Sequence, residues 1–211
     1  MYSLIYRGAR FSFYLLLILS LPLLICTSYL LDVWLVEVPK YAVEFVRISL
    51  LVSMVDALTN SLTTSIIATG KIKYYQMTVG GMLLLNIPIS YIFLVIGMSP
   101  VVVLWVALGI SLLCMVLRIL FVKNLLGMRI WDFVKEVCVN CFFVGALSTA
   151  FPFLFYRLIG CDDFTSFIII TLICVFCSLA FTLMVGCHKS EKAVLYDKIK
   201  AVLGKTHGKN R

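Results

Sequence analysis

The strongest constraint on this chain is a series of apolar runs, each long enough to cross a lipid bilayer as a helix. Crossing the hydrocarbon layer takes roughly 20 apolar residues in an α-helix. At 63% hydrophobic and 13% charged residues, the chain carries too much apolar surface for a water-soluble core. The sequence therefore predicts an all-α integral membrane protein with about six transmembrane helices. The predicted spans are residues 11–31, 41–67, 75–96, 101–122, 137–156 and 164–185.

Basic residues are distributed unequally between the two ends of these spans. Six crossings place both termini on one side, in a bundle over residues 1–187 with a basic tail over 188–211. The opposite side holds only Lys40 and Arg157. This positive-inside pattern predicts cytoplasmic termini, and it assigns the net charge of +8 to topology rather than to nucleic-acid binding. Outside the tail, the cations predicted on the cytoplasmic side are Arg7, Arg10, Lys71, Lys73, Lys123, Arg129 and Lys135.

The second run, residues 41–67, carries polar groups that are costly in lipid. They recur at helical spacing, so they share one face of the predicted helix. An ionised group at the bilayer centre costs at least about 2.5–3.5 kcal/mol, so this face is expected to line a protein interior or a hydrophilic cavity. Asp56 is the strongest candidate for a functional residue. We call this face the polar stripe; it consists of Ser49, Ser53, Asp56, Asn60 and Thr63.

Six side chains are candidates for lining a substrate cavity: Arg47, Ser53, Asp56, Asn60, Asn86 and Arg118. Asp56 and Asn60 would offer hydrogen bonds to a polar substrate, and Arg47 would offer charge to an anionic one. Each has a structural alternative. Arg47 can pair with Glu44 one turn away, and Asp56 can be satisfied by another helix. Arg118 lies near the end of its span, where its side chain can reach the cytoplasmic headgroups.

Asn86 stands beside Pro88, and this pair has two interpretations. It can mark an unwound segment or hinge of the kind that transporters place at binding sites. It can equally be an ordinary proline kink.

The sequence predicts no metal site, no cofactor and no enzymatic activity. The pairs Cys138/Cys141 and Cys174/Cys177 are expected at different depths, where cysteine packs as a small apolar residue. We expect no disulfide. Both histidines lie in the tail, so the spans hold no nucleophile–base arrangement.

Several segments, taken in order, resemble bacterial polysaccharide biosynthesis flippases. These are the O-antigen and lipid-linked oligosaccharide transporters with a MATE-like fold, which serve lipopolysaccharide assembly. The resemblance covers about residues 4–135. The segments that carry it are Ile5-Tyr-Arg7-Gly-Ala-Arg10-Phe, Trp34-Leu-x-Glu37-x-Pro39-x-Tyr41-Ala42, Phe45-Val-Arg47, Ala68-Thr-Gly-Lys-Ile-Lys-x-Tyr75-Gln76 and Leu84-Leu-Asn86-Ile-Pro88-Ile-Ser-Tyr91.

The resemblance implies a fold of two six-helix lobes around a central cavity, with a polyprenyl-pyrophosphate-linked oligosaccharide as cargo. This chain would be the C-terminal lobe, and Met1 an internal methionine of a longer, here truncated, parent. Its partner would be the N-terminal lobe, on the same parent chain or on a separate chain. Two alternatives remain open. In a MATE-like drug or cation antiporter, Asp56 would be the cation site; in a non-transporting scaffold, the polar stripe would only hold helices together.

Overall fold

The protein is described by a computed structural model covering residues 2–160 and 163–186, and these residues form helices and no strand. Met1 and the predicted basic tail, residues 188–211, lie outside the described residues. The helices are α1 (Tyr2–Ile25), α2 (Thr27–Trp34), α3 (Ala42–Ala68), α4 (Ile72–Leu84), α5 (Asn86–Val95), α6 (Val102–Leu126), α7 (Ile130–Phe133), the π-helical η1 (Val134–Val139), α8 (Asn140–Ile159), α9 (Phe164–Phe181) and the π-helical η2 (Thr182–Gly186).

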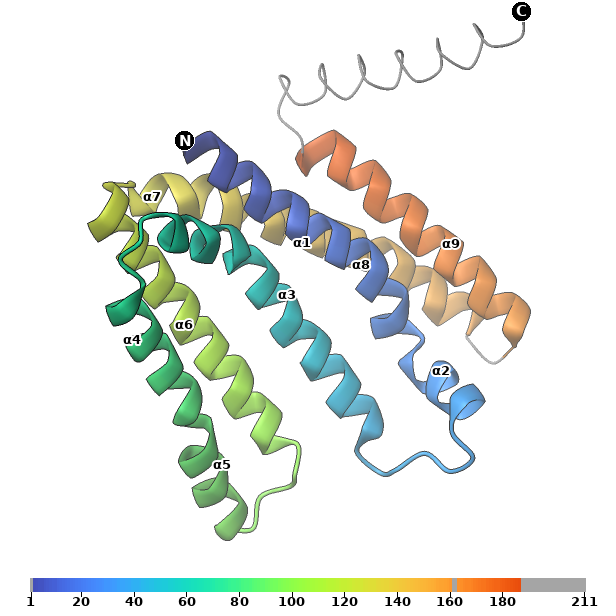
Figure 1. Ribbon diagram of the computed structural model, residues 1–211. Helices are drawn as coiled ribbons and strands as arrows, with labels where there is room; N and C mark the ends of the chain where they lie inside the picture. The colour runs from blue at the N-terminus through green and yellow to red at the C-terminus, as the bar shows by residue number, and fades with distance from the viewer. Residues whose placement is uncertain (1, 161–162, 187–211) are drawn as a thin grey trace, which may run out of the picture.

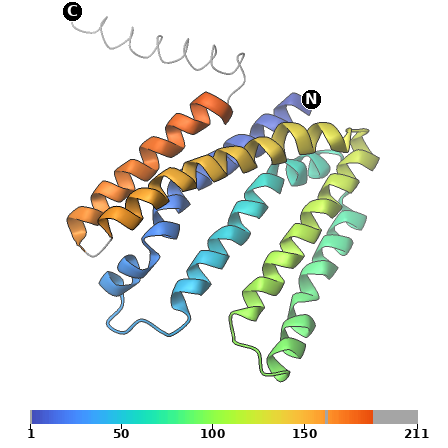
Figure 2. The same ribbon diagram turned by 180° about the vertical axis from the view of Figure 1, so that it is seen from behind.

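The long helices alternate in direction, so their connections gather at two ends of the bundle. The start of α1 and the α3–α4 and α6–α7 connections lie at one end, whereas the α2–α3 and α5–α6 connections lie at the other (Figure 1). The first end is tied together by Tyr2, whose hydroxyl donates to the carbonyl of Leu126. Seen from behind, α8 covers α1 and runs beside α9 (Figure 2).

The bundle has α3 at its centre, packed against α1 on one side and α6 on the other. Apolar residues of α1, such as Leu17 and Leu21, are fully buried in the core together with Leu62 and Ile66 of α3. The pair α4–α5 lies beyond α6 at the edge of the bundle and is mostly exposed (Figure 1). Helix α3 therefore connects the α4–α6 part of the bundle, by packing, to the part that contains α1.

The first helix starts earlier than predicted. Residues 11–31 were expected to form it, but α1 begins at Tyr2 and ends at Ile25. Charged residues near the interface do not stop a helix, because its backbone hydrogen bonds are internal; Arg10 is buried within it. The chain breaks at Cys26, one turn after Pro22, and continues as α2.

The third predicted span, residues 75–96, consists of two helices that meet at Leu85. Pro88 explains the break, because proline has no N–H and its ring crowds the carbonyl of the residue four positions earlier, Leu84. Leu85 keeps right-handed helical backbone angles, with φ −63° and ψ −17°, and its N–H still bonds to the carbonyls of Gly81 and Met82. This is an ordinary proline kink and not an unwound segment.

Helices α6 and α7 are separated by a short turn at residues 127–129. The helix α6 continues to Leu126 and is ended by Gly127, whose φ of 74° is in the left-handed region. The next helix then begins at Ile130 and runs through η1 into α8. Phe133 and Val137 are fully buried, and the Phe133 ring contacts Tyr6 edge-on at 5.9 Å.

Within the described residues, 5 helices are long and apolar enough to cross a membrane. They are Tyr2–Ile25, Ile72–Val95, Val102–Leu126, Ile130–Leu158 and Phe164–Gly186. The charged helix α3 is not among them, although it has 27 residues. The protein is thus all-helical over its described part, with several helices suited to a membrane.

Candidate functional site

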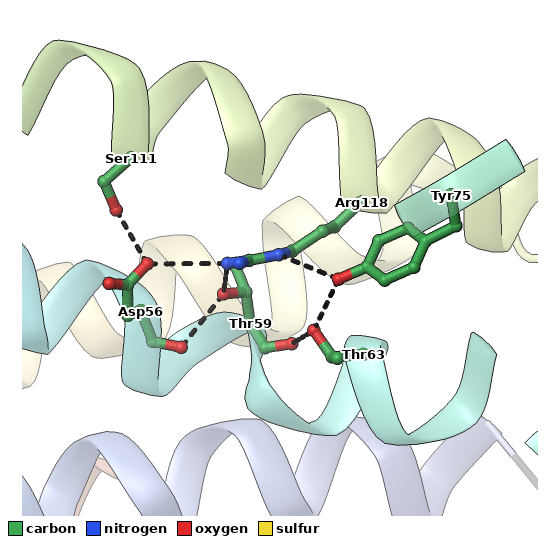
Figure 3. Close-up of polar contacts among 6 residues, drawn as sticks. All are labelled: Asp56, Thr59, Thr63, Tyr75, Ser111 and Arg118. Carbon is green, nitrogen blue, oxygen red and sulfur yellow. Dashed lines mark hydrogen bonds and ion pairs between the residues drawn. The ribbon is translucent and has the colours of Figure 1, made fainter. Parts of the chain in front are cut away.

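A network of polar side chains joins α3, α4 and α6 in the middle of the bundle (Figure 3). Arg118 lies at its centre. Its Nη1 donates to Asp56 Oδ1 at 3.5 Å and to the hydroxyl of Thr59, and its Nε donates to Tyr75 Oη at 3.3 Å. Ser111 donates to the same oxygen of Asp56 at 2.8 Å. We call Asp56, Thr59, Thr63, Tyr75, Ser111 and Arg118 the Asp56–Arg118 network.

The positions of these residues on their helices explain why they meet. Asp56, Thr59 and Thr63 follow one another at steps of three and four along α3, so they share one face. Ser111 and Arg118 are two turns apart on α6 and form a second polar face. Because α3 and α6 pack side by side, the two faces meet. Tyr75, buried near the start of α4, closes the network from the side.

The hydroxyl protons in this network have one consistent order. Thr59 donates to the backbone carbonyl of Asp56 at 2.9 Å, which leaves its oxygen free to accept from Arg118. Thr63 donates to the carbonyl of Thr59 at 3.2 Å, so the 3.1 Å contact between Thr63 and Tyr75 is donated by the tyrosine. Tyr75 in turn accepts from Arg118 Nε. The hydroxyls of Thr59, Thr63 and Tyr75 therefore each both donate and accept.

The two charged groups keep bonding capacity beyond the network. Asp56 Oδ2 and Arg118 Nη2 have no hydrogen-bond partner among the described residues, and neither is an orphaned buried atom there. The side chain of Asp56 is 48% exposed, and that of Arg118 is 14% exposed. The network therefore presents a carboxylate acceptor beside guanidinium donors, at the side of a helix bundle rather than sealed inside it.

The predicted polar stripe divides into an inward and an outward part. Asp56 and Thr63 contact the α6 and α4 side chains, but Ser53 and Asn60 are exposed. Ser53 donates to the carbonyl of Ser49 in its own helix. The stripe divides in this way because the helices packed against α3 cover only part of its width. The rotation of α3 about its own axis determines which residues are covered. Thr59, which the stripe did not include, replaces Ser53 and Asn60 in the network.

Arg47 lies apart from the Asp56–Arg118 network. Its Nε donates to the carbonyl of Leu24 at 3.2 Å and to the hydroxyl of Thr27 at 3.4 Å, where α1 breaks before α2. The broken helix leaves carbonyls without their usual partners, and Arg47 and Thr27 satisfy them. Glu44 is exposed and forms no ion pair with Arg47. Arg47 also lines a cavity of about 330 Å³ with Phe153.

Arg118 belongs to the network, whereas Asn86 does not. Arg118 turns into the bundle rather than toward the headgroups, because Asp56, Thr59 and Tyr75 offer it three acceptors. Asn86 lies on α5, where its side chain accepts a hydrogen bond from Ser90 at 3.1 Å. No contact joins Asn86 to the network.

Four network residues were not among the six predicted cavity candidates: Thr59, Tyr75, Ser111 and Thr63, of which only Thr63 belonged to the polar stripe. Ser111, Cys114 and Arg118 follow at steps of three and four in an otherwise apolar run, and this pattern contained the missing signal. Tyr75 carried no comparable signal, because a tyrosine near a span end is ordinary in membrane helices.

No group of three or more potential metal ligands occurs within residues 2–160 and 163–186. In comparisons with protein-family models, curated proteins and solved structures, no match to this chain was found. The arguments about function below therefore rest on the residues and their geometry.

Proposed function

We propose that this protein is one lobe of a lipid-linked oligosaccharide flippase and that it moves polyprenyl-pyrophosphate glycans across a bacterial inner membrane. In this proposal α3 is a sixth crossing, both termini are cytoplasmic, and a second lobe completes a MATE-like transporter. The protein carries no chemistry of its own. The observation that carries the proposal is the open pair of Asp56 Oδ2 and Arg118 Nη2 on an otherwise apolar bundle.

Sugars suit such a pair because each hydroxyl can donate and accept at once. The free oxygen of Asp56 would accept from one sugar hydroxyl, and the free guanidinium nitrogen of Arg118 would donate to the same or the next oxygen. Ser53 and Asn60 add exposed polar groups on the same helix. This face would be costly against lipid, which is why we propose that a second lobe covers it.

The same geometry argues against a cation antiporter. A cation at Asp56 would compete with the guanidinium of Arg118, which already lies 3.5 Å from the carboxylate. Any cation would also have to approach a positive charge that is held in place by Thr59 and Tyr75. Charge repulsion therefore favours a neutral, hydroxyl-rich group over a cation at this site.

Binding of a lipid-linked sugar to the purified chain in nanodiscs tests the proposal. Three probes separate the possibilities: a polyprenyl-pyrophosphate-linked oligosaccharide, the same lipid without sugar, and the lipophilic cation tetraphenylphosphonium. We expect the glycosylated lipid to bind best. Asp56→Asn should weaken its binding about tenfold, because a hydrogen bond to a charged group contributes roughly 1.5–3 kcal/mol.

The matched control is Thr78→Val. Thr78 is exposed on α4 and donates only to the carbonyl of Tyr74 in its own helix, so its replacement should leave binding unchanged. Equal binding of the glycosylated and sugar-free lipids would refute the proposed recognition of sugar. Preference for tetraphenylphosphonium that is lost in Asp56→Asn would instead identify the antiporter.

A further inference from the structure

A second cavity, of about 620 Å³, lies between the first turns of α1 and the last turns of α3. Leu4 and Phe11 of α1 give it apolar walls, and Thr64 and Ala68 of α3 form the facing side. Arg7 contributes a cation. This cavity shares no residue with the Asp56–Arg118 network or with the Arg47 cavity.

Gly8 of α1 faces Ser61 of α3 at the floor of the cavity. A Cβ added to Gly8 would lie 2.6 Å from Ser61 Oγ and 3.4 Å from Ser61 Cβ, so a larger residue there would require the Ser61 hydroxyl to rotate away. The larger side chains of Leu4 and Phe11, before and after Gly8 in α1, form the walls of the cavity. The result is a groove whose shape is fixed by the packing of two long helices.

The hydroxyls of Thr64 and Ser65 in the α3 wall of the groove do not need water as a hydrogen-bond partner. Thr64 donates its hydroxyl proton to the carbonyl of Asn60 at 3.0 Å, and Ser65 donates to Leu62 at 2.7 Å. Their polar groups are thus satisfied by their own helix. The groove can therefore hold an apolar chain without leaving these hydroxyls unpaired.

Exposed aromatic residues indicate the level of the groove in a membrane. Tyr2, Tyr74 and Trp131 are exposed in the first turns of α1, α4 and α7, and Trp34 is exposed at the end of α2. The first turns of α1, α4 and α7 lie at one end of the bundle, and α2 lies toward the other (Figure 1). Tyrosine and tryptophan concentrate where the hydrocarbon meets the headgroups. A groove that starts at Leu4, two residues after Tyr2, lies at that boundary.

The residues that line the groove include one cation and no carboxylate. The cation is Arg7, which is exposed, whereas Asp132 and Glu136 act on the neighbouring Tyr6 but do not line the groove. The connection that follows α3 adds Lys71 and Lys73, both exposed, at the same end of the bundle. Cations at this level attract anionic lipid headgroups, and each contributes roughly 1 kcal/mol.

We propose that this groove binds one anionic phospholipid of the adjacent leaflet. Its headgroup phosphate lies against Arg7, and one acyl chain passes along Phe11 toward the floor at Gly8 and Ser61. The guanidinium donates to the phosphate oxygens, for which its planar fork is well suited. This site requires that the bundle lies in a membrane, but it does not depend on the proposed transport of oligosaccharides.

Native mass spectrometry of the purified chain tests the proposal. The protein is released from micelles that contain equal amounts of phosphatidylglycerol and phosphatidylcholine with identical acyl chains, and the bound lipids are counted. We expect one retained phosphatidylglycerol. Arg7→Gln should lower the preference for phosphatidylglycerol about fivefold, the equivalent of one surface cation. Ala68→Phe, which fills the groove, should abolish retention of both lipids.

The control is Lys123→Gln, which removes an exposed cation at the same end of the bundle but outside the groove. It should leave the preference unchanged, because Lys123 does not line the groove in which Arg7 holds the phosphate. An equal loss in Lys123→Gln and Arg7→Gln would overturn the proposal and indicate diffuse surface charge. Retention of lipid in a folded Ala68→Phe variant would overturn it as well. Displacement of phosphatidylglycerol by a polyprenyl phosphate would assign the groove to the transported lipid instead.

Discussion

The ion pair of Asp56 and Arg118 is expected to stabilise the packing of α3 against α6, and a double-mutant cycle can measure by how much. The variants are Asp56→Ala, Arg118→Ala and the double substitution. Each single substitution leaves one charged group without its partner, whereas the double substitution removes both. The two single substitutions should therefore cost more, when added, than the double one.

The size of this coupling follows from the geometry. At 3.5 Å, two unit charges attract by roughly 5 kcal/mol with an effective dielectric constant of about 20. The Asp56 side chain is 48% exposed, so screening reduces this attraction considerably. Thr59 and Tyr75 also hold Arg118 in place when the carboxylate is removed. We therefore expect a coupling free energy of about 1–2 kcal/mol.

Equilibrium unfolding in mixed micelles, followed by tryptophan fluorescence, gives the free energy of unfolding of each variant. Asn60→Ala is the matched control, because Asn60 is exposed one turn further along α3 and its replacement should stay within about 0.5 kcal/mol. Additive effects, with a coupling below roughly 0.3–0.5 kcal/mol, would show that the pair contributes nothing and would refute the reasoning.

Two further substitutions test other parts of the structure by the same unfolding measurement. Gly186→Ala should destabilise the protein by about 1–3 kcal/mol, because the new Cβ would lie 2.8 Å from the ring of Tyr14. Gly80→Ala, with nothing within 4 Å, should be neutral or stabilising by up to roughly 1 kcal/mol, and equal effects at both sites would contradict the packing at η2. Arg47→Met should cost about 0.5–1.5 kcal/mol, because the Leu24 carbonyl loses its Arg47 donor and keeps only the hydroxyl of Thr27; a neutral result would show that this hydroxyl alone satisfies the carbonyl.

The apolar runs predicted the helices well but placed some of their ends wrongly. The run at residues 41–67 corresponds closely to α3, and that at 164–185 to α9 with η2. Hydropathy, however, ends a span at the first charged residue, whereas a helix ends where its hydrogen bonds do. The helix α6 passes through Lys123 and ends at Gly127, which adopts the left-handed conformation that closes a helix.

The candidate site was predicted only in part, because periodicity identifies a helix face but not its neighbour. The stripe correctly drew attention to Asp56, yet nothing in its spacing distinguishes Arg47 from Arg118 as the nearby cation. That choice depends on how α3 is rotated between α1 and α6. The position of Arg47 depends on the helix break that follows Pro22. This break leaves the Leu24 carbonyl available, and Arg47 donates a hydrogen bond to it.

The two sides of α3 differ in the free energy needed to separate them from the neighbouring helix. Toward α1 it is held by fully buried apolar side chains and by the contact of Gly8 with Ser61, where an added Cβ would lie 2.6 Å from the hydroxyl oxygen. Toward α6 the network residues add hydrogen bonds, two of them to a half-exposed carboxylate that water or a sugar could also satisfy. Exchanging such hydrogen bonds for others costs little free energy, because new bonds replace the old ones. Separating packed apolar surfaces costs more, because their van der Waals contacts are lost. If the helix bundle changes shape when it binds a polar ligand, the change should therefore occur between α3 and α6, while α1 and α3 move together.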